Sequence, residues 1–287
     1  MHNFRASLWM VTAMAAFAIE DAVIKHLADQ MPVGQIMLLL GVGGFVAFGL
    51  LLRPRGLRLL VPQALRGAVL LRNLCEVVGA GGVVLAIALL PLATVTAILQ
   101  AMPLVVTLGA ALFLGEPVGW RRWAAILVGL AGVLIIIRPG AADFDPAALI
   151  AVVAILGLAG RDLATRRVPT SVDSLQLAGW GFGMLIPAGL LLLLMGAPPL
   201  VPSAVQWIWL VAATVAGMLG YFALVAATRL GDIAATVPFR YSRLVFATLI
   251  GLIFFAERPD GWTIAGSLLV VGAGLFSFWR EMKRRPQ

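Results

Sequence analysis

The sequence predicts an all-α polytopic membrane protein with ten transmembrane helices, built as an inverted repeat of two five-helix units with both termini in the cytoplasm. Composition, ten long apolar runs and internal self-similarity predict this fold. Of the 287 residues, 62% are hydrophobic and only 12% are charged, and the mean hydropathy is +1.03. A soluble domain is roughly 45–50% apolar and about 25% charged. The chain therefore has the composition of a protein whose solvent is a lipid bilayer.

The ten apolar runs each have the length of a membrane span. A hydrocarbon core about 30 Å thick takes roughly 20 residues of α-helix. Hydrophobic residues are continuous along each run rather than alternating, which excludes a transmembrane β-barrel. The short linkers leave no room for a soluble domain. The expected helices are Ser7–Ile24, Val33–Leu52, Gly67–Leu90, Leu92–Leu114, Trp120–Ile137, Pro146–Thr165, Leu175–Met195, Val205–Thr228, Ile233–Phe255 and Gly261–Trp279.

The first run follows Arg5 and could be mistaken for a signal peptide. It is longer than the apolar part of a signal peptide and runs into Glu20 and Asp21, so we expect it to stay as a helix.

The distribution of Lys and Arg sets the expected orientation. Of the 21 Lys and Arg residues, fifteen fall on the side that carries the termini, and Lys25, Arg138 and Arg258 fall on the other. Positive residues concentrate on the cytoplasmic side of membrane proteins, so both termini are expected there. This pattern also accounts for the net charge of +8 without a nucleic-acid partner.

The chain resembles itself at an offset of 141 residues. This shift pairs Asp21 with Asp162, Lys25 with Arg166, Gln35 with Gln176 and Glu116 with Glu257, and a shift of 142 pairs Gly119-Trp120 with Gly261-Trp262. Several matches at equivalent helix ends indicate a duplicated unit, with the first repeat over residues 1–140 and the second over 141–287. Because five helices are an odd number, the second unit is expected to enter the bilayer from the opposite side.

Four segments then carry a resemblance to a known family. Residues 116–123 and 128–140 look like the end of the first half of an EamA-type transporter of the drug/metabolite transporter superfamily, and residues 238–242 and 274–281, with Glu257, resemble the second half. Within that superfamily the sequence is most similar to bacterial YddG-type exporters of aromatic and other hydrophobic amino acids. The resemblance implies alternating access around a central cavity lined by helices 1, 3, 4, 6, 8 and 9.

Polar residues fall on those same helices, whereas helices 2, 5, 7 and 10 carry almost no charge in their interiors. Charged groups inside a membrane are rare and face a bundle interior. The candidate substrate-binding residues are Glu20, Asp21, Arg72, Asn73, Glu76, Gln100, Tyr221, Arg240, Tyr241 and Arg243.

Two interpretations of these charges stay open. Arg72 and Glu76 are four residues apart on one helical face and can pair, so the whole set could neutralise itself. Alternatively, part of it binds a zwitterion, with an arginine holding the carboxylate and an acid holding the ammonium group. On this view we expect Glu76 to act with Arg240 or Arg243.

Several other residues have structural or mechanical interpretations. Pro103 and Pro238 are candidate hinges, because proline removes a helix hydrogen bond. Glu116 and Glu257 lie at equivalent helix ends, where each is expected to cap the following helix. No metal site or cofactor is expected, since His2 and His26 are distant in the sequence and Cys75 has no second cysteine.

The favoured function is therefore a secondary transporter that exports aromatic or hydrophobic amino acids across the inner membrane, for which a monomer is sufficient. A carrier of nucleoside-like or other metabolites is the alternative. An intramembrane enzyme or a channel is less favoured, because no catalytic constellation and no ring of like charge is recognisable.

Overall fold

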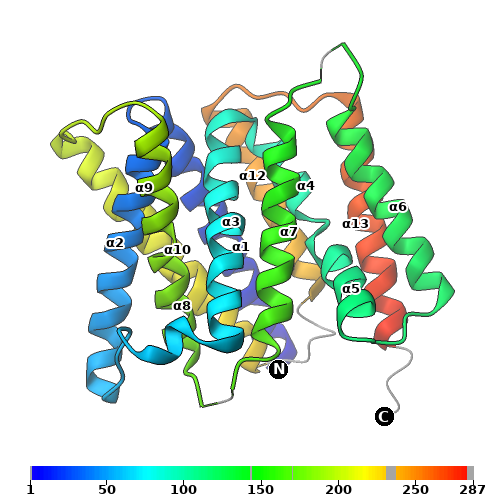
Figure 1. The fold of residues 1–287 in the computed structure, drawn as a ribbon. Helices are drawn as coiled ribbons and strands as arrows, with labels where there is room; N and C mark the ends of the chain where they lie inside the picture. The colour runs from blue at the N-terminus through cyan, green and yellow to red at the C-terminus, as the bar shows by residue number, and fades with distance from the viewer. Residues whose placement is uncertain (1, 143, 170, 231–236, 283–287) are drawn as a thin grey trace.

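The computed structural model describes residues 2–142, 144–169, 171–230 and 237–282, and all the regular secondary structure in those ranges is helical (Figure 1). Within them, nine helices are long and apolar enough to cross a membrane. Seven spans are single helices. They are α1 (His2–Ala28), α2 (Val33–Leu52), α3 (Gly67–Leu89), α6 (Trp120–Ile137), α7 (Ala148–Thr165), α10 (Ala204–Leu230) and α13 (Gly261–Met282).

Two further spans, which the sequence predicts as continuous, are each broken near the middle. The fourth consists of α4 (Leu92–Leu99) and α5 (Met102–Phe113), with Pro103 in the first turn of α5. The seventh consists of α8 (Ser174–Gly183) and α9 (Leu185–Met195). Pro103 and Pro187 have no backbone N–H, so a helix hydrogen bond is missing just after each break.

The ninth expected helix differs most from the prediction. Residues 233–236 lie outside the described ranges, Val237–Tyr241 form the 3-10 turn η3, and α12 spans only Ser242–Phe254. Pro238 therefore lies in a 3-10 turn rather than inside an α-helix. Two more 3-10 turns, η1 (Arg53–Arg55) and η2 (Pro62–Leu65), lie between α2 and α3.

Local details recur at the 141-residue offset. The break at Gln100 and Ala101 in the fourth span corresponds to the boundary between η3 and α12 at Tyr241 and Ser242. Gly115 and its counterpart Ala256 both have left-handed backbones, with φ of 67° and 51°. That conformation suits glycine and is strained for alanine, so Ala256 has the backbone geometry of Gly115 against its own preference.

The helix contacts recur in the same way. The most extensive helix contacts are α1 with α10 and α3 with α7. The offset relates α1 to α7 and α10 to α3, so these two contacts correspond to each other. The offset exchanges α6 with α13 and α2 with α9, so each of these two helix pairs corresponds to itself. Figure 1 shows that α1 begins at the end of the bundle where α13 finishes, whereas α7 begins at the opposite end.

Glycines allow these helices to touch. A methyl group at Gly157 of α7 would lie 2.5 Å from the backbone nitrogen of Gly79 in α3, and one at Gly189 would lie 2.5 Å from the carbonyl oxygen of Gly34. Small residues of this kind let membrane helices approach closely enough for backbone contact.

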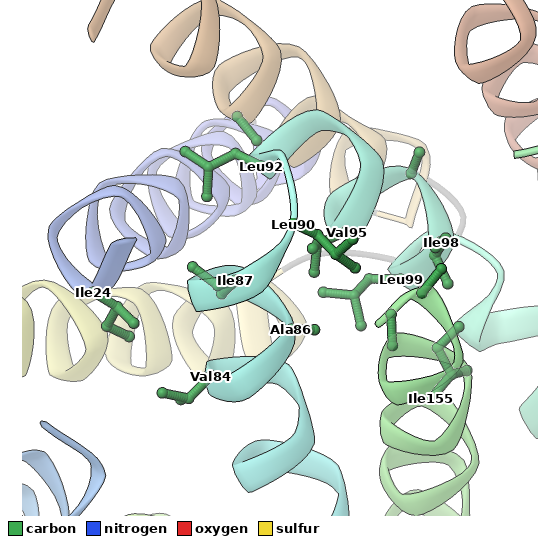
Figure 2. Close-up of a cluster of buried hydrophobic side chains, with 14 of the residues drawn as sticks. Ile24, Val84, Ala86, Ile87, Leu90, Leu92, Val95, Ile98, Leu99 and Ile155 are labelled. Carbon is green, nitrogen blue, oxygen red and sulfur yellow. The ribbon is translucent and has the colours of Figure 1, made fainter. Parts of the chain in front are cut away.

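A large apolar cluster lies at one end of the bundle. Figure 2 shows ten labelled side chains that converge there from α1, α3, α4 and α7, around the turn that joins α3 to α4. We call the end where α1 finishes the outer end and the opposite one the inner end, following the orientation that the Lys and Arg distribution predicts. The labelled residues are Ile24, Val84, Ala86, Ile87, Leu90, Leu92, Val95, Ile98, Leu99 and Ile155.

The expected capping role of Glu257 is partly wrong. Glu257 does cap a helix, but its Oε2 accepts a hydrogen bond of 2.8 Å from the backbone N–H of Leu92, at the start of α4 in the other half of the chain. The helix that follows Glu257 is α13, and there Asp260 accepts from the backbone N–H of Thr263 at 2.8 Å. The equivalent Glu116 instead pairs with Arg166.

Candidate functional site

A buried ion pair joins α1 to α12. Both carboxylate oxygens of Asp21 accept hydrogen bonds from Nη2 of Arg243, at 2.9 and 2.8 Å, and Nε donates a third bond at 3.2 Å. The guanidinium also lies 5.3 Å from the centre of the Phe17 ring, a cation–π contact. Asp21 and Arg243 therefore neutralise each other.

Glu20 lies beside this pair, next to Asp21 in the sequence. Its carboxylate rests against the bare backbone of Gly217 in α10, where a methyl group would overlap it. Asp21 and Arg243 act on it electrostatically. Among the described residues, however, no hydrogen bond or ion pair reaches its side chain. Because Arg243 is already bound to Asp21, Glu20 is an acidic side chain in the membrane interior to which no described basic side chain is bound.

A second charged network joins α3 to α7. Oε1 of Glu76 accepts a 3.2 Å hydrogen bond from Arg161, and Oε2 lies 3.0 Å from Nη2 of Arg72. The expected pairing of Arg72 with Glu76 is thus present, as a close ion contact outside hydrogen-bond geometry. Arg72 also donates to Oδ1 of Asn73 at 3.0 Å, and Arg161 donates to Asp162 at 2.9 Å. Two arginines and two acids make this network neutral.

Arg161 and Asp162 extend this network beyond the residues expected from the sequence. The available signal was the repeat, because Asp162 occupies the position that Asp21 has in the first half. Asn73 links the network to the preceding turn, since its amide donates to the carbonyl of Ala64 at 3.0 Å.

Arg240 is the second candidate residue with a side chain that binds no described partner. It lies on η3, which packs on α1. Its carbonyl accepts a 3.5 Å hydrogen bond from the Gln100 amide, so Gln100 contacts the turn rather than the guanidinium. Asp162, Arg161 and Arg243 act on Arg240 electrostatically. Within the described part of the chain, no hydrogen bond or ion pair is made by the guanidinium itself.

The aromatic candidates have fixed positions. Tyr221 donates to the carbonyl of Ser174 at 2.8 Å and lies edge-on to Phe48. Tyr241 is buried with its hydroxyl against Gly274 of α13, where a methyl group would overlap it. Tyr221 interacts electrostatically with Arg72 and Arg161 and so borders the charged network, whereas Tyr241 contacts α13.

Among the described residues, the interior thus combines two neutral clusters with one acidic side chain, Glu20, and one basic side chain, Arg240, that make no hydrogen bond or ion pair. Holding a charge inside a membrane costs several kcal/mol, so such groups face a pathway or a ligand. Among the described residues, no group of three or more His, Cys, Asp or Glu side chains could hold a metal ion.

These features define the class: a multi-pass membrane protein whose charged groups lie between its helices, as in the substrate pathways of secondary transporters. The chain belongs to the EamA-like transporter family, whose model matches it twice, over residues 4–138 and 145–279.

Individual relatives are transporters of unlike molecules. The chain is 28% identical to a riboflavin transporter of Vibrio cholerae, over 100% of this chain and 97% of the relative. It is 28% identical to an S-adenosylmethionine uptake transporter of Rickettsia felis over 67% of this chain and 65% of that protein, and 29% identical to a pseudopaline exporter of Pseudomonas aeruginosa over 93% of each. A solved structure with a TM-score of 0.61 and 21% identity covers 98% of this chain and 99% of its own, and shares the fold.

The comparisons agree with the expected class and not with the expected substrate. This protein is a multi-pass membrane transporter of small metabolites, and its family and these relatives are transporters rather than enzymes. An aromatic amino acid is not among the substrates that these relatives are named for, so the YddG-type resemblance carries no support from them.

Proposed function

We propose that the protein is a secondary transporter that moves a small zwitterionic metabolite by alternating access, and that Arg240 and Glu20 hold the two ends of that substrate. One observation carries the proposal: in the described part of the chain, these are the intramembrane acidic and basic side chains that make no hydrogen bond or ion pair. A guanidinium binds a carboxylate through charge-assisted hydrogen bonds, and a carboxylate binds an ammonium group in the same way.

The other candidate charges are already engaged. Arg243 is bound by Asp21 through three hydrogen bonds, and Glu76 contacts two arginines. We therefore shift the acidic role that the sequence assigns to Glu76 onto Glu20, and we choose Arg240 over Arg243. Both sites are tied to α1, because η3 packs against that helix.

The simplest molecule that meets both charges is an amino acid. Phe17 lies on α1 one turn before Glu20, and a neighbouring aromatic ring favours an apolar or aromatic side chain. We accordingly keep export of aromatic or hydrophobic amino acids from the cytoplasm as the specific proposal. The relative named for S-adenosylmethionine, a molecule with an amino-acid end, is consistent with a zwitterion site.

The architecture proposed for this cycle is two inverted units, residues 1–140 and 141–287, which exchange conformations about an axis in the membrane plane. The recurrence of contacts at the 141-residue offset supports it, as does the double match of the family model. The breaks beside Pro103 and Pro238 supply the hinges, since unwound segments absorb rotation with little cost.

A second candidate is a neutral aromatic heterocycle. The match to a riboflavin transporter along the whole chain favours it. Such a substrate would need neither Glu20 nor Arg240, so the two candidates make different predictions for the same variants.

Transport by purified protein in liposomes tests the proposal. Labelled amino acids, S-adenosylmethionine and riboflavin are supplied with and without a pH gradient. Arg240→Gln is expected to weaken apparent affinity for an amino acid by about tenfold or more, but not for its carboxamide, because a lost charged hydrogen bond is worth about 1.5–3 kcal/mol. Glu20→Gln is expected to do the same for the amino acid, but not for the analogue that lacks the amine.

Arg55→Gln is the control, because Arg55 forms an exposed ion pair with Asp173 outside the membrane interior. If both site variants carried amino acids with wild-type affinity, the zwitterion site would be refuted. Saturable transport of riboflavin alone, unchanged in both variants, would favour the second candidate.

A further inference from the structure

Two ion pairs connect the halves of the chain at opposite ends of the bundle. At the outer end, Nζ of Lys25 lies 3.1 Å from Oε1 of Glu257. At the inner end, Nη1 of Arg166 donates to Oε1 of Glu116 at 2.6 Å. The 141-residue offset converts Lys25 into Arg166 and Glu116 into Glu257. Each pair is therefore the counterpart of the other, with its base and its acid exchanged between the halves.

The outer pair is enclosed and supported by further bonds. The side chains of Lys25 and Glu257 are only 16% and 11% exposed. Lys25 also donates to the carbonyl of Leu90 at 2.7 Å, and Glu257 accepts from the N–H of Leu92 at 2.8 Å. This pair consequently fastens α1, the turn between α3 and α4, and the segment after α12 to one another.

The outer pair also lies directly at the apolar cluster. Leu90 and Leu92, whose backbones it binds, are both labelled members of the cluster in Figure 2. Removing one partner of an ion pair shielded in this way would leave an uncompensated buried charge, so the pair ties the segments at this end firmly together.

The inner pair is in a different environment. The side chains of Arg166 and Glu116 are 48% and 49% exposed. An ion pair open to water contributes only about 0–1 kcal/mol, so it holds its end weakly. The two equivalent pairs thus differ in exposure to water. A carrier that is closed at one end and open at the other would show this difference.

We propose that the two pairs are alternating latches of the transport cycle. In the conformation described, the outer latch, Lys25–Glu257, is closed and the inner latch, Arg166–Glu116, is hydrated. In the opposite conformation, the inner latch is enclosed and the outer latch is opened to water. Because each latch stabilises one conformation, neutralising one shifts the equilibrium toward the conformation that the other stabilises.

Cysteine labelling measures that shift without any substrate. Cys75 is the single cysteine of the chain, so Cys75→Ser gives a background free of thiols. Thr96 in α4 is 1% exposed and follows Leu92 by one helical turn, and Thr96→Cys places a reporter inside the outer closure. A membrane-impermeant maleimide is applied from each face of oriented vesicles, and the rate of labelling is measured.

Two neutralising variants are expected to act in opposite directions. Glu257→Gln, which keeps an oxygen for the Leu92 N–H, is expected to raise labelling from the outer face by about tenfold, equivalent to about 1.4 kcal/mol. Glu116→Gln is expected to lower that rate, because it weakens the latch of the other end. Lys25→Arg keeps the charge and is expected to label like the parent.

Asp260→Asn is the matched control. Asp260 forms a 2.6 Å ion pair with Arg138 at the same outer end, but that pair joins α6 to α13 and is not part of either latch. Melting curves of each variant confirm folding. An unchanged rate in folded Glu257→Gln, or a shift in the same direction for Glu257→Gln and Glu116→Gln, would overturn the latch proposal. Neither outcome depends on which metabolite is carried.

Discussion

Replacing Glu76 with glutamine separates a structural role for this carboxylate from a substrate-binding role. The side chain is 7% exposed and lies 3.0 Å from a nitrogen of Arg72 and 3.2 Å from a nitrogen of Arg161. Glutamine keeps the shape and removes the charge. Arg72, itself 8% exposed, would then keep one described hydrogen-bond partner, the neutral amide of Asn73.

The expected loss of stability follows from this geometry. Removing one partner of a buried ion pair costs about 3–5 kcal/mol, because the charge left behind is uncompensated. Arg161 keeps its bond to Asp162, so the loss should fall near the lower end of that range, at about 3 kcal/mol. Glu116→Gln is the matched control, since it breaks an exposed pair worth about 0–1 kcal/mol.

The assay is equilibrium unfolding of both variants in mixed detergent micelles, followed by helical circular dichroism, with transport measured in parallel. We expect Glu76→Gln to be clearly less stable and to retain measurable transport when folded. A variant as stable as the parent that no longer carries substrate would refute this reasoning. Glu76 would then be the substrate carboxylate, as the sequence first suggests.

Two further predictions concern packing and pH. Gly157→Val should prevent α7 from contacting Gly79 of α3 and lower the melting temperature or the folded yield, whereas Gly272→Ala, which meets nothing within 4 Å, should leave both unchanged. Hydrogen bonds from Thr263 lower the pKa of Asp260 below its usual value of 3.8. The stabilisation by this carboxylate should be present above that value and be lost as the pH falls through the lower, folded-state pKa. Melting curves of wild type and Asp260→Asn should therefore differ at pH 7 and converge in strong acid, and a constant difference would contradict this.

The sequence was most informative about contacts within one helix. Arg72 and Glu76 are four residues apart, so helix geometry alone predicts their contact. The second partner of Glu76 is Arg161, 85 residues later, and that contact depends on how α3 packs on α7. The packing rests on glycines such as Gly79 and Gly157, which hydropathy does not distinguish from other small residues.

The helix breaks were only partly predictable for a related reason. Pro103 pointed to a disturbance in the fourth span, and the structure breaks that span two residues earlier. Length and hydropathy treat Leu175–Met195 as one span, although Met184 divides it. A break without strong local polarity depends on tertiary contacts that a hydropathy pattern does not record.

Positions that match between the halves make corresponding structural contacts. The amide of Gln35, in the first half, donates to the carbonyl of Leu200 in the second, at 2.6 Å. Its counterpart Gln176, in the second half, donates to the carbonyl of Arg58 in the first, at 2.8 Å. Each glutamine thus binds a linker of the opposite half. The two proposed latches follow the same pattern, since each joins a residue of one half to a residue of the other.

The candidate site comes instead from positions at which the halves differ. The 141-residue offset places Glu20 against Arg161, Leu99 against Arg240, and Met102 against Arg243. In a strictly symmetric chain, any charge placed near the centre would appear twice with the same sign. Divergence of these three positions gives one half the acid and the other the bases, which is the arrangement a molecule with one charge of each sign requires.

Exchanging the acidic and basic side chains of the proposed site tests this arrangement. Glu20→Arg and Arg240→Glu should each abolish transport of the zwitterion. The double variant should restore transport only if the site accepts the substrate with its two ends reversed. Substrate flux in liposomes, compared with both single variants, would show which holds. Wild-type flux in either single variant would argue that the asymmetry does not serve binding.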